Sequence, residues 1–213
     1  MAVHGMTATT KAIVLDVSLR LLSCVCIGYF AVNAAGAFAA DRSRITLAVA
    51  VFSEITTIVI SLISRRPPQR DWEPLTVVAT VYAGSLFALL ISVEPGIRLL
   101  DERLCAALQI AGIVWAIISK LALGRSFGWL PADRGIVNNG PYRIVRHPIY
   151  LGYLISHIGF LAANLNVQNL LAYTSLYVAQ FYRIHREEKL LMRNEAYRNY
   201  AGRVRYRLIY GIF

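Results

Sequence analysis

The sequence predicts an all-α integral membrane protein, built as a helical bundle, because both its composition and its hydropathy pattern differ from those of soluble domains. Apolar residues make up 57% of the 213 residues and charged residues only 16%, with a mean hydropathy of +0.52. A soluble domain carries about a quarter charged residues. The apolar residues also gather in runs, most of them long enough to cross roughly 30 Å of hydrocarbon. Lipid offers no hydrogen bonds to a backbone, so these runs should be helices.

The chain is expected to form one membrane domain with two parts, namely N-terminal transmembrane helices over residues 1–119 and a C-terminal region over residues 120–213. We expect five to six transmembrane segments, the last two forming a C-terminal helical hairpin that only partly crosses the bilayer. The tail from Arg183 onward should be an amphipathic cytosolic segment. The expected apolar segments cover residues 12–38, 45–64, 75–93, 104–123, 148–163 and 168–182.

The formal net charge of +10 arises from basic residues that lie between and after the apolar runs. Basic loops follow the second and fourth runs and the tail is also basic, whereas the loops near Asp41 and Glu94 mix both signs. Cytoplasmic loops carry the excess of Lys and Arg, so we expect a bacterial inner-membrane protein with its active site facing the cytoplasm. A membrane surface is the expected partner and nucleic acid is not, since the chain lacks a soluble basic helix or an aromatic base-stacking platform.

The stretch 139–153 (NGPYRIVRHPIYLGY) places Arg146 and His147 at the start of an apolar helix that begins near Pro148. A second polar cluster, residues 183–188, follows a later apolar run. Charge this dense beside a membrane is costly unless it is used, which predicts two halves of one site for a charged ligand. The helix N-terminus favours a carboxylate, and Glu187 and its neighbour can accept hydrogen bonds from an amine or a ribose. The alternative is that the basic residues merely anchor helix ends to lipid headgroups.

Four motifs together resemble the isoprenylcysteine carboxyl methyltransferase family, which is related to phospholipid N-methyltransferases. They are Gly140-Pro141-Tyr142, the stretch 146–152 (RHPIYLG), Glu187-Glu188 and the stretch 197–200 (YRNY). The resemblance covers about residues 120–213, which it marks as a methyltransferase region. It implies a helical membrane bundle whose C-terminal segments wrap S-adenosyl-L-methionine, while a lipophilic acceptor arrives from the bilayer.

The resemblance also implies roles for individual residues. It assigns Arg183 to the methyl acceptor, which is a carboxylate, an amine or a thiol, and makes Glu187 and Glu188 catalytic candidates because an amine or thiol would need a base. The cofactor contacts that we expect are Arg134, Gly135, Ile136, Val137, Tyr142, Arg146, His147, Pro148, Ile149, Tyr150 and Glu187. Tyr210 stands where relatives commonly carry Pro.

Two other functions share some of these features. Membrane sterol reductases that use NADPH resemble the chain at RHP-x-YLG and at the closing YRLI-x-GIF, and a non-catalytic lipid-binding role needs no cofactor at all. The chain has no Gly-x-Gly-x-x-Gly fingerprint, and its His residues lack metal-ligand spacing, so no metal is expected. Glu54, near the middle of a span, either lines the acceptor pocket or partners Lys120. His157 is expected to be a hydrogen-bonded interior residue.

Overall fold

The described part of the chain folds into helices, as the hydropathy runs predict. The computed structural model describes residues 8–63, 73–123 and 137–213, and within these ranges it contains no β-strand beyond one isolated bridge. In chain order the helices are α1 (Ala8–Ala40), α2 (Ile45–Ile63), α3 (Pro74–Gly84), the 3-10 helix η1 (Leu86–Leu90), α4 (Glu102–Leu123), the 3-10 helix η3 (Gly140–Arg143), α5 (Pro148–Ala163), α6 (Val167–Leu191) and α7 (Glu195–Arg203).

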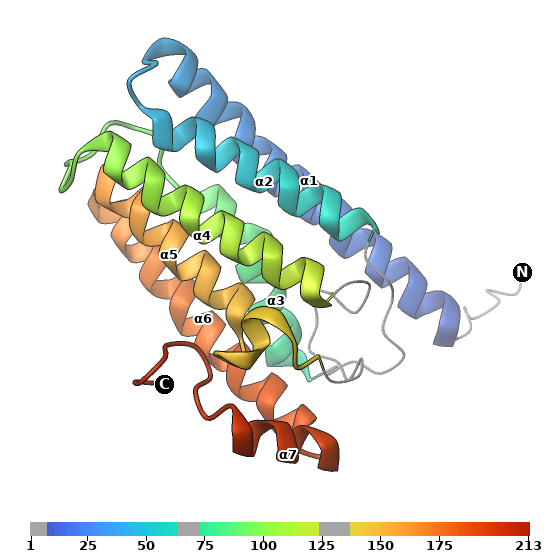
Figure 1. Cartoon of the computed structure of the whole chain (residues 1–213). Coiled ribbons are helices and arrows are strands. Elements are labelled where there is room, and N and C mark those ends of the chain that lie inside the picture. The colour runs from blue at the N-terminus through green and yellow to red at the C-terminus, as the bar shows by residue number, and fades with distance from the viewer. Residues whose placement is uncertain (1–7, 64–72, 124–136) are drawn as a thin grey trace, which may run out of the picture.

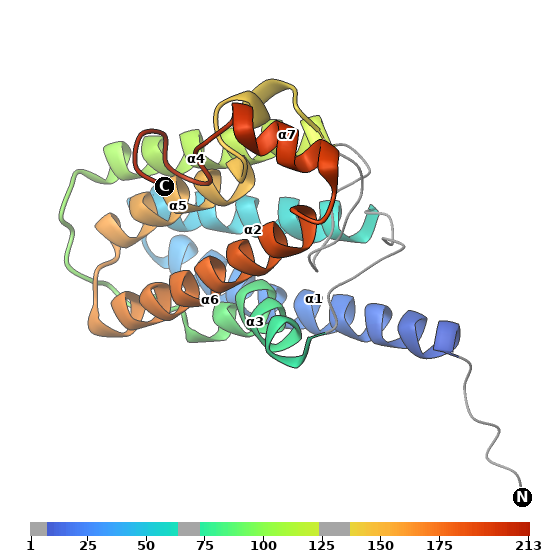
Figure 2. The same ribbon diagram turned by 90° about the horizontal axis from the view of Figure 1, so that it is seen from below.

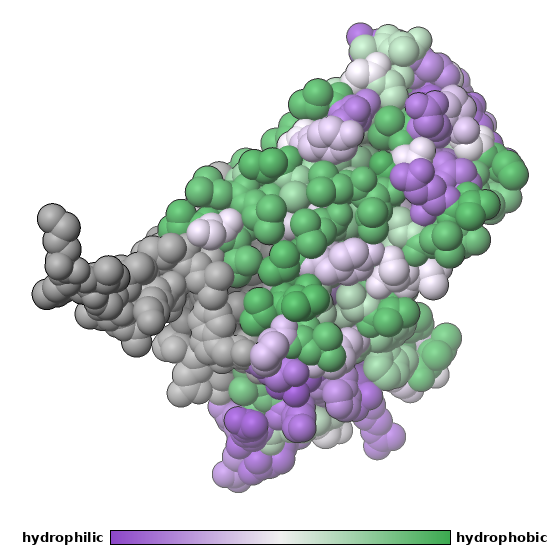
Figure 3. Space-filling model, turned by 180° about the vertical axis from the view of Figure 1, so that it is seen from behind, coloured by the Kyte–Doolittle hydropathy of each residue, from purple (hydrophilic) through white to green (hydrophobic). Residues whose placement is uncertain are grey.

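The long helices α1, α2, α4, α5 and α6 run side by side, and α7 lies across one end of the bundle (Figures 1 and 2). Two helical segments, Val17–Ala40 and Glu102–Leu123, are long and apolar enough to cross a membrane. The surface in Figure 3 is largely apolar along the helices and hydrophilic toward the ends. Large apolar side chains such as Val32 and Leu121 are more than 70% exposed, which suits contact with lipid tails.

The third apolar run, residues 75–93, was expected to be one continuous helix, and that expectation is wrong. Helix α3 ends one residue before Ser85, whose backbone dihedral angles (φ −144°, ψ −68°) are not helical, and η1 follows. The Ser85 hydroxyl lies 2.6 Å from the hydroxyl of Ser23 in α1, so a bond across the bundle holds the break in place. The break turns Phe87 toward the cavity described below.

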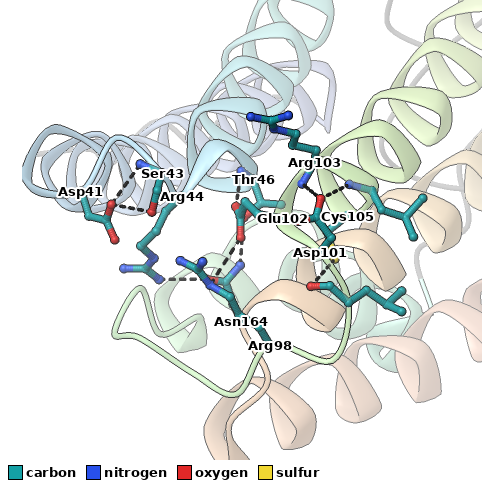
Figure 4. A network of polar contacts seen from close by, with 12 residues as sticks. Asp41, Ser43, Arg44, Thr46, Arg98, Asp101, Glu102, Arg103, Cys105 and Asn164 are labelled. Atoms are coloured by element: carbon teal, nitrogen blue, oxygen red, sulfur yellow. Dashed lines mark hydrogen bonds and ion pairs between the residues drawn. The ribbon is translucent and has the colours of Figure 1, made fainter.

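Loops that are far apart in sequence meet at the end of the bundle away from α7, here called the far end. The N–H of Ile97 donates to the carbonyl of Leu165 (2.7 Å), and the guanidinium of Arg44 donates to the side-chain oxygen of Asn164 (2.8 Å). Thr46 donates through its hydroxyl to the buried carboxylate of Glu102 (2.7 Å). Figure 4 shows how this network joins the α1–α2 turn to the start of α4 and the end of α5.

The opposite end of the bundle, the α7 end, gathers the start of α3, the end of α4, the start of α5 and the end of α6. The hydroxyl of Tyr182 in α6 donates to the carboxylate of Glu73 (2.8 Å), which also caps α3 by accepting from the N–H of Thr76. Arg146 and Arg183 lie at this same end, so basic residues from two predicted cytoplasmic segments come together there.

Helices α4 and α5 pack with their backbones in direct contact, because glycine stands at the crossing. A Cβ atom on Gly112 would lie 2.4 Å from the backbone nitrogen of Ser156, and one on Gly152 would lie 2.7 Å from the backbone nitrogen of Ala116. Real side chains do not approach backbone atoms so closely, so both positions require glycine. This contact fixes the start of α5, which carries the RHP motif, against α4.

Candidate active site

A cavity of about 230 Å³ runs from the α7 end into the apolar middle of the bundle. Its polar mouth contains residues of the predicted site, and its inner part is lined by side chains of α1, α2, η1, α5 and α6. The predicted site residues that line it are Val137, Tyr142, Arg146, His147, Ile149, Tyr150, Arg183 and Glu187. Pro148 and Glu188 are not part of its wall. The predicted contacts Arg134, Gly135 and Ile136 lie outside the described residues.

Glu188 joins the two polar clusters from a buried position behind the cavity wall. Its Oε1 accepts from Nε2 of His147 (2.9 Å) and from the hydroxyl of Tyr197 (2.7 Å). Its Oε2 lies 3.2 Å from the guanidinium of Arg146 and 3.7 Å from that of Arg207. One carboxylate therefore connects the start of α5, the end of α6, α7 and the C-terminal segment.

The electrostatics of this cluster keep Glu188 ionised. Burial disfavours the charged carboxylate, but the hydrogen bonds from His147 and Tyr197 and the charge of Arg146 outweigh that effect, so the pKa of Glu188 is held below its ordinary value. Burial, together with the nearby Glu188 carboxylate, raises the pKa of Tyr197. Burial is also the main cause that raises the pKa of Tyr200 to about 12. Both tyrosines are thus neutral hydrogen-bond donors at physiological pH.

Glu187 has a different environment from its neighbour, although the two are adjacent in sequence. Its side chain is 25% exposed and lines the cavity, and its carboxylate lies 3.9 Å from Nδ1 of His147. Successive residues of a helix point about 100° apart, so one of the pair faces the cavity and the other faces the packed interior. Glu187 therefore keeps oxygen atoms available to a ligand, whereas those of Glu188 are engaged.

Arg183 lies one helical turn before Glu187 on the same face of α6, deeper in the bundle. Its side chain is buried, and its guanidinium donates to Oε1 of Gln180 (2.9 Å) and lies 5.6 Å from the ring centre of Tyr150. Gln180 also lines the cavity and was not identified from the sequence. A polar residue three positions before Arg183, within an apolar run, was the available signal.

The C-terminal segment contributes to the site through backbone carbonyls of Tyr206 and Arg207, which the sequence did not single out. The backbone N–H of Arg146 donates to the carbonyl of Tyr206 (2.9 Å), and that of His147 donates to the carbonyl of Arg207 (2.7 Å). Nearby, the hydroxyl of Tyr200 donates to the carbonyl of Tyr142 (2.7 Å). The motif at the start of α5 is thus held by backbone bonds that its own side chains do not reveal.

The inner part of the cavity contains two residues that the sequence had singled out. Nδ1 of His157 lies 2.9 Å from the hydroxyl of Tyr177, which confirms it as a hydrogen-bonded interior residue. Glu54 lines the cavity wall from α2. Within the described residues, no group of three or more His, Cys, Asp or Glu could hold a metal ion.

The comparison with known families agrees with three of the four motifs, and the fourth, the stretch 197–200, lies outside the matched residues. Residues 104–193 match the sequence model of the isoprenylcysteine carboxyl methyltransferase (ICMT) family; they include most of α4, the RHP motif, α5, α6 and both Glu187 and Glu188. No curated protein matches the chain. The match supports a methyltransferase in a membrane, and an enzyme rather than a purely structural protein. The predicted resemblance is thereby confirmed: from α4 to the end of α6 the chain is similar to the isoprenylcysteine carboxyl methyltransferase family.

Proposed function

We propose that this protein transfers the methyl group of S-adenosyl-L-methionine to a lipophilic acceptor at the cytoplasmic face of a bacterial inner membrane. The observation that carries the proposal is one continuous cavity with a charged mouth and a mainly apolar and aromatic inner part. Glu187 and His147 line the mouth, while Phe30 and Phe160 line the part within the bundle. Such a cavity can hold a polar cofactor at one end and receive a lipid-like molecule at the other, without exposing either reacting group to bulk water.

The residues at the mouth fit the amino-acid part of the proposed cofactor. Arg146 lines the cavity, and its buried Nε has no hydrogen-bond partner among the described residues, so it can donate to a carboxylate. Glu187 offers a partly exposed carboxylate to an ammonium group. The rings of Tyr142 and Tyr150 supply flat apolar surface for an adenine. We assign these four residues, with His147, to cofactor binding.

The bound cofactor would supply an electrophilic methyl group on a sulfonium. Methyl transfer forms a bond from the acceptor lone pair to carbon while the carbon–sulfur bond breaks and its electron pair stays on sulfur. The protein must mainly align the two reactants, which contributes up to about 7–11 kcal/mol in favourable cases. Arg183 would orient an acceptor carboxylate by charge-assisted hydrogen bonds, with Gln180 holding its guanidinium. For an amine or thiol acceptor, Glu187 would take up the released proton. Glu188 is a positioning residue.

The orientation follows from the basic α7 end. Arg146 and Arg183 lie at that end, which favours the cytoplasm. Helices α1, α2, α4, α5 and α6 would provide five crossings, and α3 with η1 and the loop to Ile97, which lead from the α7 end to the far end, would provide the sixth.

The direct test is calorimetry on the protein purified in a non-ionic detergent, followed by mass spectrometry of membrane extracts incubated with methyl-labelled cofactor. We expect S-adenosylhomocysteine to bind and a labelled lipophilic product to form. NADPH binding without S-adenosylhomocysteine binding would reject methyl transfer in favour of a reductase.

A further inference from the structure

The inner part of the cavity is not a plain hydrocarbon pocket. Its wall includes Phe87 of η1, Tyr153 and His157 of α5, and Tyr173 of α6. The rings are in mutual contact: the ring centres of His157 and Tyr173 are 4.9 Å apart, those of Phe87 and Tyr173 are 5.1 Å apart, and Tyr153 stacks on His157 at 6.1 Å. These four rings form a continuous surface, which we call the aromatic wall.

One carboxylate, that of Glu54, faces the same space from the middle of α2. Its side chain is only half-buried because it borders the cavity, and it forms no hydrogen bond or ion pair with any of the described residues. Lys120 interacts with Glu54 electrostatically, and the Lys120 ammonium also lies 5.1 Å from the ring centre of Tyr153, so the protein itself places one cation beside this carboxylate and these rings. A carboxylate inside a membrane bundle is costly unless it has a function, and its oxygens here remain available to a ligand.

We propose that Glu54 and the aromatic wall form a subsite for an ammonium group. The methyl acceptor is then a lipophilic molecule that carries an amine in addition to the group that is methylated. Aromatic faces attract cations, and a carboxylate forms charge-assisted hydrogen bonds with an ammonium, so the two together favour this group over a neutral one. The inference rests on the proposed function only in calling the ligand the methyl acceptor. The pocket itself stands on the cavity, the wall and Glu54.

The ammonium subsite lies apart from the point of methyl transfer. Tyr173 precedes Arg183 by ten residues on α6, which corresponds to about 15 Å along the helix axis. Arg183 and Glu187 are at the cofactor end, whereas the aromatic wall is in the bundle interior. The amine is therefore a recognition group, and a different atom of the acceptor receives the methyl group.

The test uses three probes of matched chain length, decylamine, decanol and decanoate, at pH 7 in a non-ionic detergent, each with and without S-adenosylhomocysteine. Glu54→Gln removes the charge and keeps the shape, and Ser53→Ala, at the neighbouring cavity-lining position, is the matched control. We expect decylamine to bind the unaltered protein at least tenfold more tightly than decanol. Glu54→Gln should abolish that preference while changing decanol affinity less than threefold, and Ser53→Ala should leave the preference in place.

A second variant guards against misfolding of the first. Phe87→Leu removes one aromatic face at similar volume. It should weaken the binding of decylamine about threefold and leave the binding of decanol unchanged. Equal binding of decylamine and decanol to the unaltered protein would overturn the inference, as would an equal loss of all three probes in Glu54→Gln. If the amine preference is present while S-adenosylhomocysteine fails to bind, the methyltransferase proposal falls and the ammonium subsite stands.

Discussion

Nε2 of His147 lies 2.9 Å from Oε1 of Glu188, and this buried contact joins two parts of the chain that are 41 residues apart. It places the RHP motif against the end of α6, where Glu187 and Arg183 face the cavity. The contact separates two adjacent glutamates, because the carboxylate of Glu188 is engaged in the buried cluster whereas the side chain of Glu187 lines the cavity.

Substituting the two glutamates should therefore have opposite consequences. Glu188→Ala leaves Arg146 and His147 without their buried partner, so we expect the free energy of unfolding to fall by about 3–5 kcal/mol. Glu187→Ala should leave the thermal melting temperature nearly unchanged and weaken the binding of S-adenosylhomocysteine by about 1–3 kcal/mol. Thermal melts and calorimetry on both variants measure the two effects. Equal melting temperatures for the two variants would contradict this division.

The lowered pKa of Glu188 predicts how stability depends on pH. A carboxyl whose pKa is lower in the folded state contributes stability above its unfolded pKa, and that contribution is lost as the pH falls through the folded pKa. We expect the melting temperature to decline as the pH falls below about 4.5, the ordinary value for Glu. Glu188→Gln should melt at a lower temperature near neutrality and show a flatter decline in acid. An unchanged acid slope in that variant would assign the decline to other groups.

The α4–α5 contact predicts strong sensitivity to a single methyl group. Gly112→Ala places a Cβ against the backbone of Ser156, which cannot move aside. The resulting loss in the free energy of unfolding should exceed the gain of about 1 kcal/mol that alanine brings to a helix. Gly28→Ala in α1 is the control, since nothing lies within 4 Å of its added Cβ. We expect a lower melting temperature for the first variant and an equal or higher one for the second. The reverse order would mean that the two helices can separate.

Arg183 and Gln180 should act on the acceptor and not on the cofactor. We expect Arg183→Ala to reduce methyl transfer strongly while S-adenosylhomocysteine affinity changes less than about threefold, under 1 kcal/mol. Lys should not fully restore the activity, because an ammonium lacks the planar fork of a guanidinium. Gln180→Ala should have a smaller effect of the same kind, since Gln180 orients Arg183. Loss of cofactor binding in a folded Arg183→Ala protein would instead place Arg183 in the cofactor site.

The two ends of the bundle should lie on opposite sides of the membrane. A reporter fused after Phe213 should be cytoplasmic, and one inserted near Pro95, in the loop that pairs with Leu165, should be on the other side. A cytoplasmic signal from both would show that the bundle does not span the bilayer in this orientation.

The sequence predicted the helices better than their interruptions. Hydropathy located α1, α2 and α4, and the continuation of α6 beyond Arg183 agrees with a shared face for Arg183 and Glu187. The break at Ser85 depends on a hydroxyl of α1 that is 62 residues away, and no local pattern contains that information. The sequence also does not show which way a side chain points. Glu187 and Glu188 therefore look equivalent in the sequence, and only the packing around α6 distinguishes them.

Site residues that belong to a motif could be predicted from the sequence, and those without a motif could not. Tyr142 and His147 were predicted from the stretch 139–153 and its resemblance to a known family, and both line one cavity. Gln180 has no motif of its own, and the carbonyls of Tyr206 and Arg207 act through the backbone, where side-chain identity gives no signal.

The polar network at the far end has a mechanical consequence. Hydrogen bonds fasten the α1–α2 turn to α4 and α5 at this end; they are formed by Arg44, Thr46, Glu102 and Asn164. Buried hydrogen bonds of this kind are expensive to break inside a bundle. We therefore expect a lipid that enters between the helices to part them away from the far end, where this network holds α1, α2, α4 and α5 together.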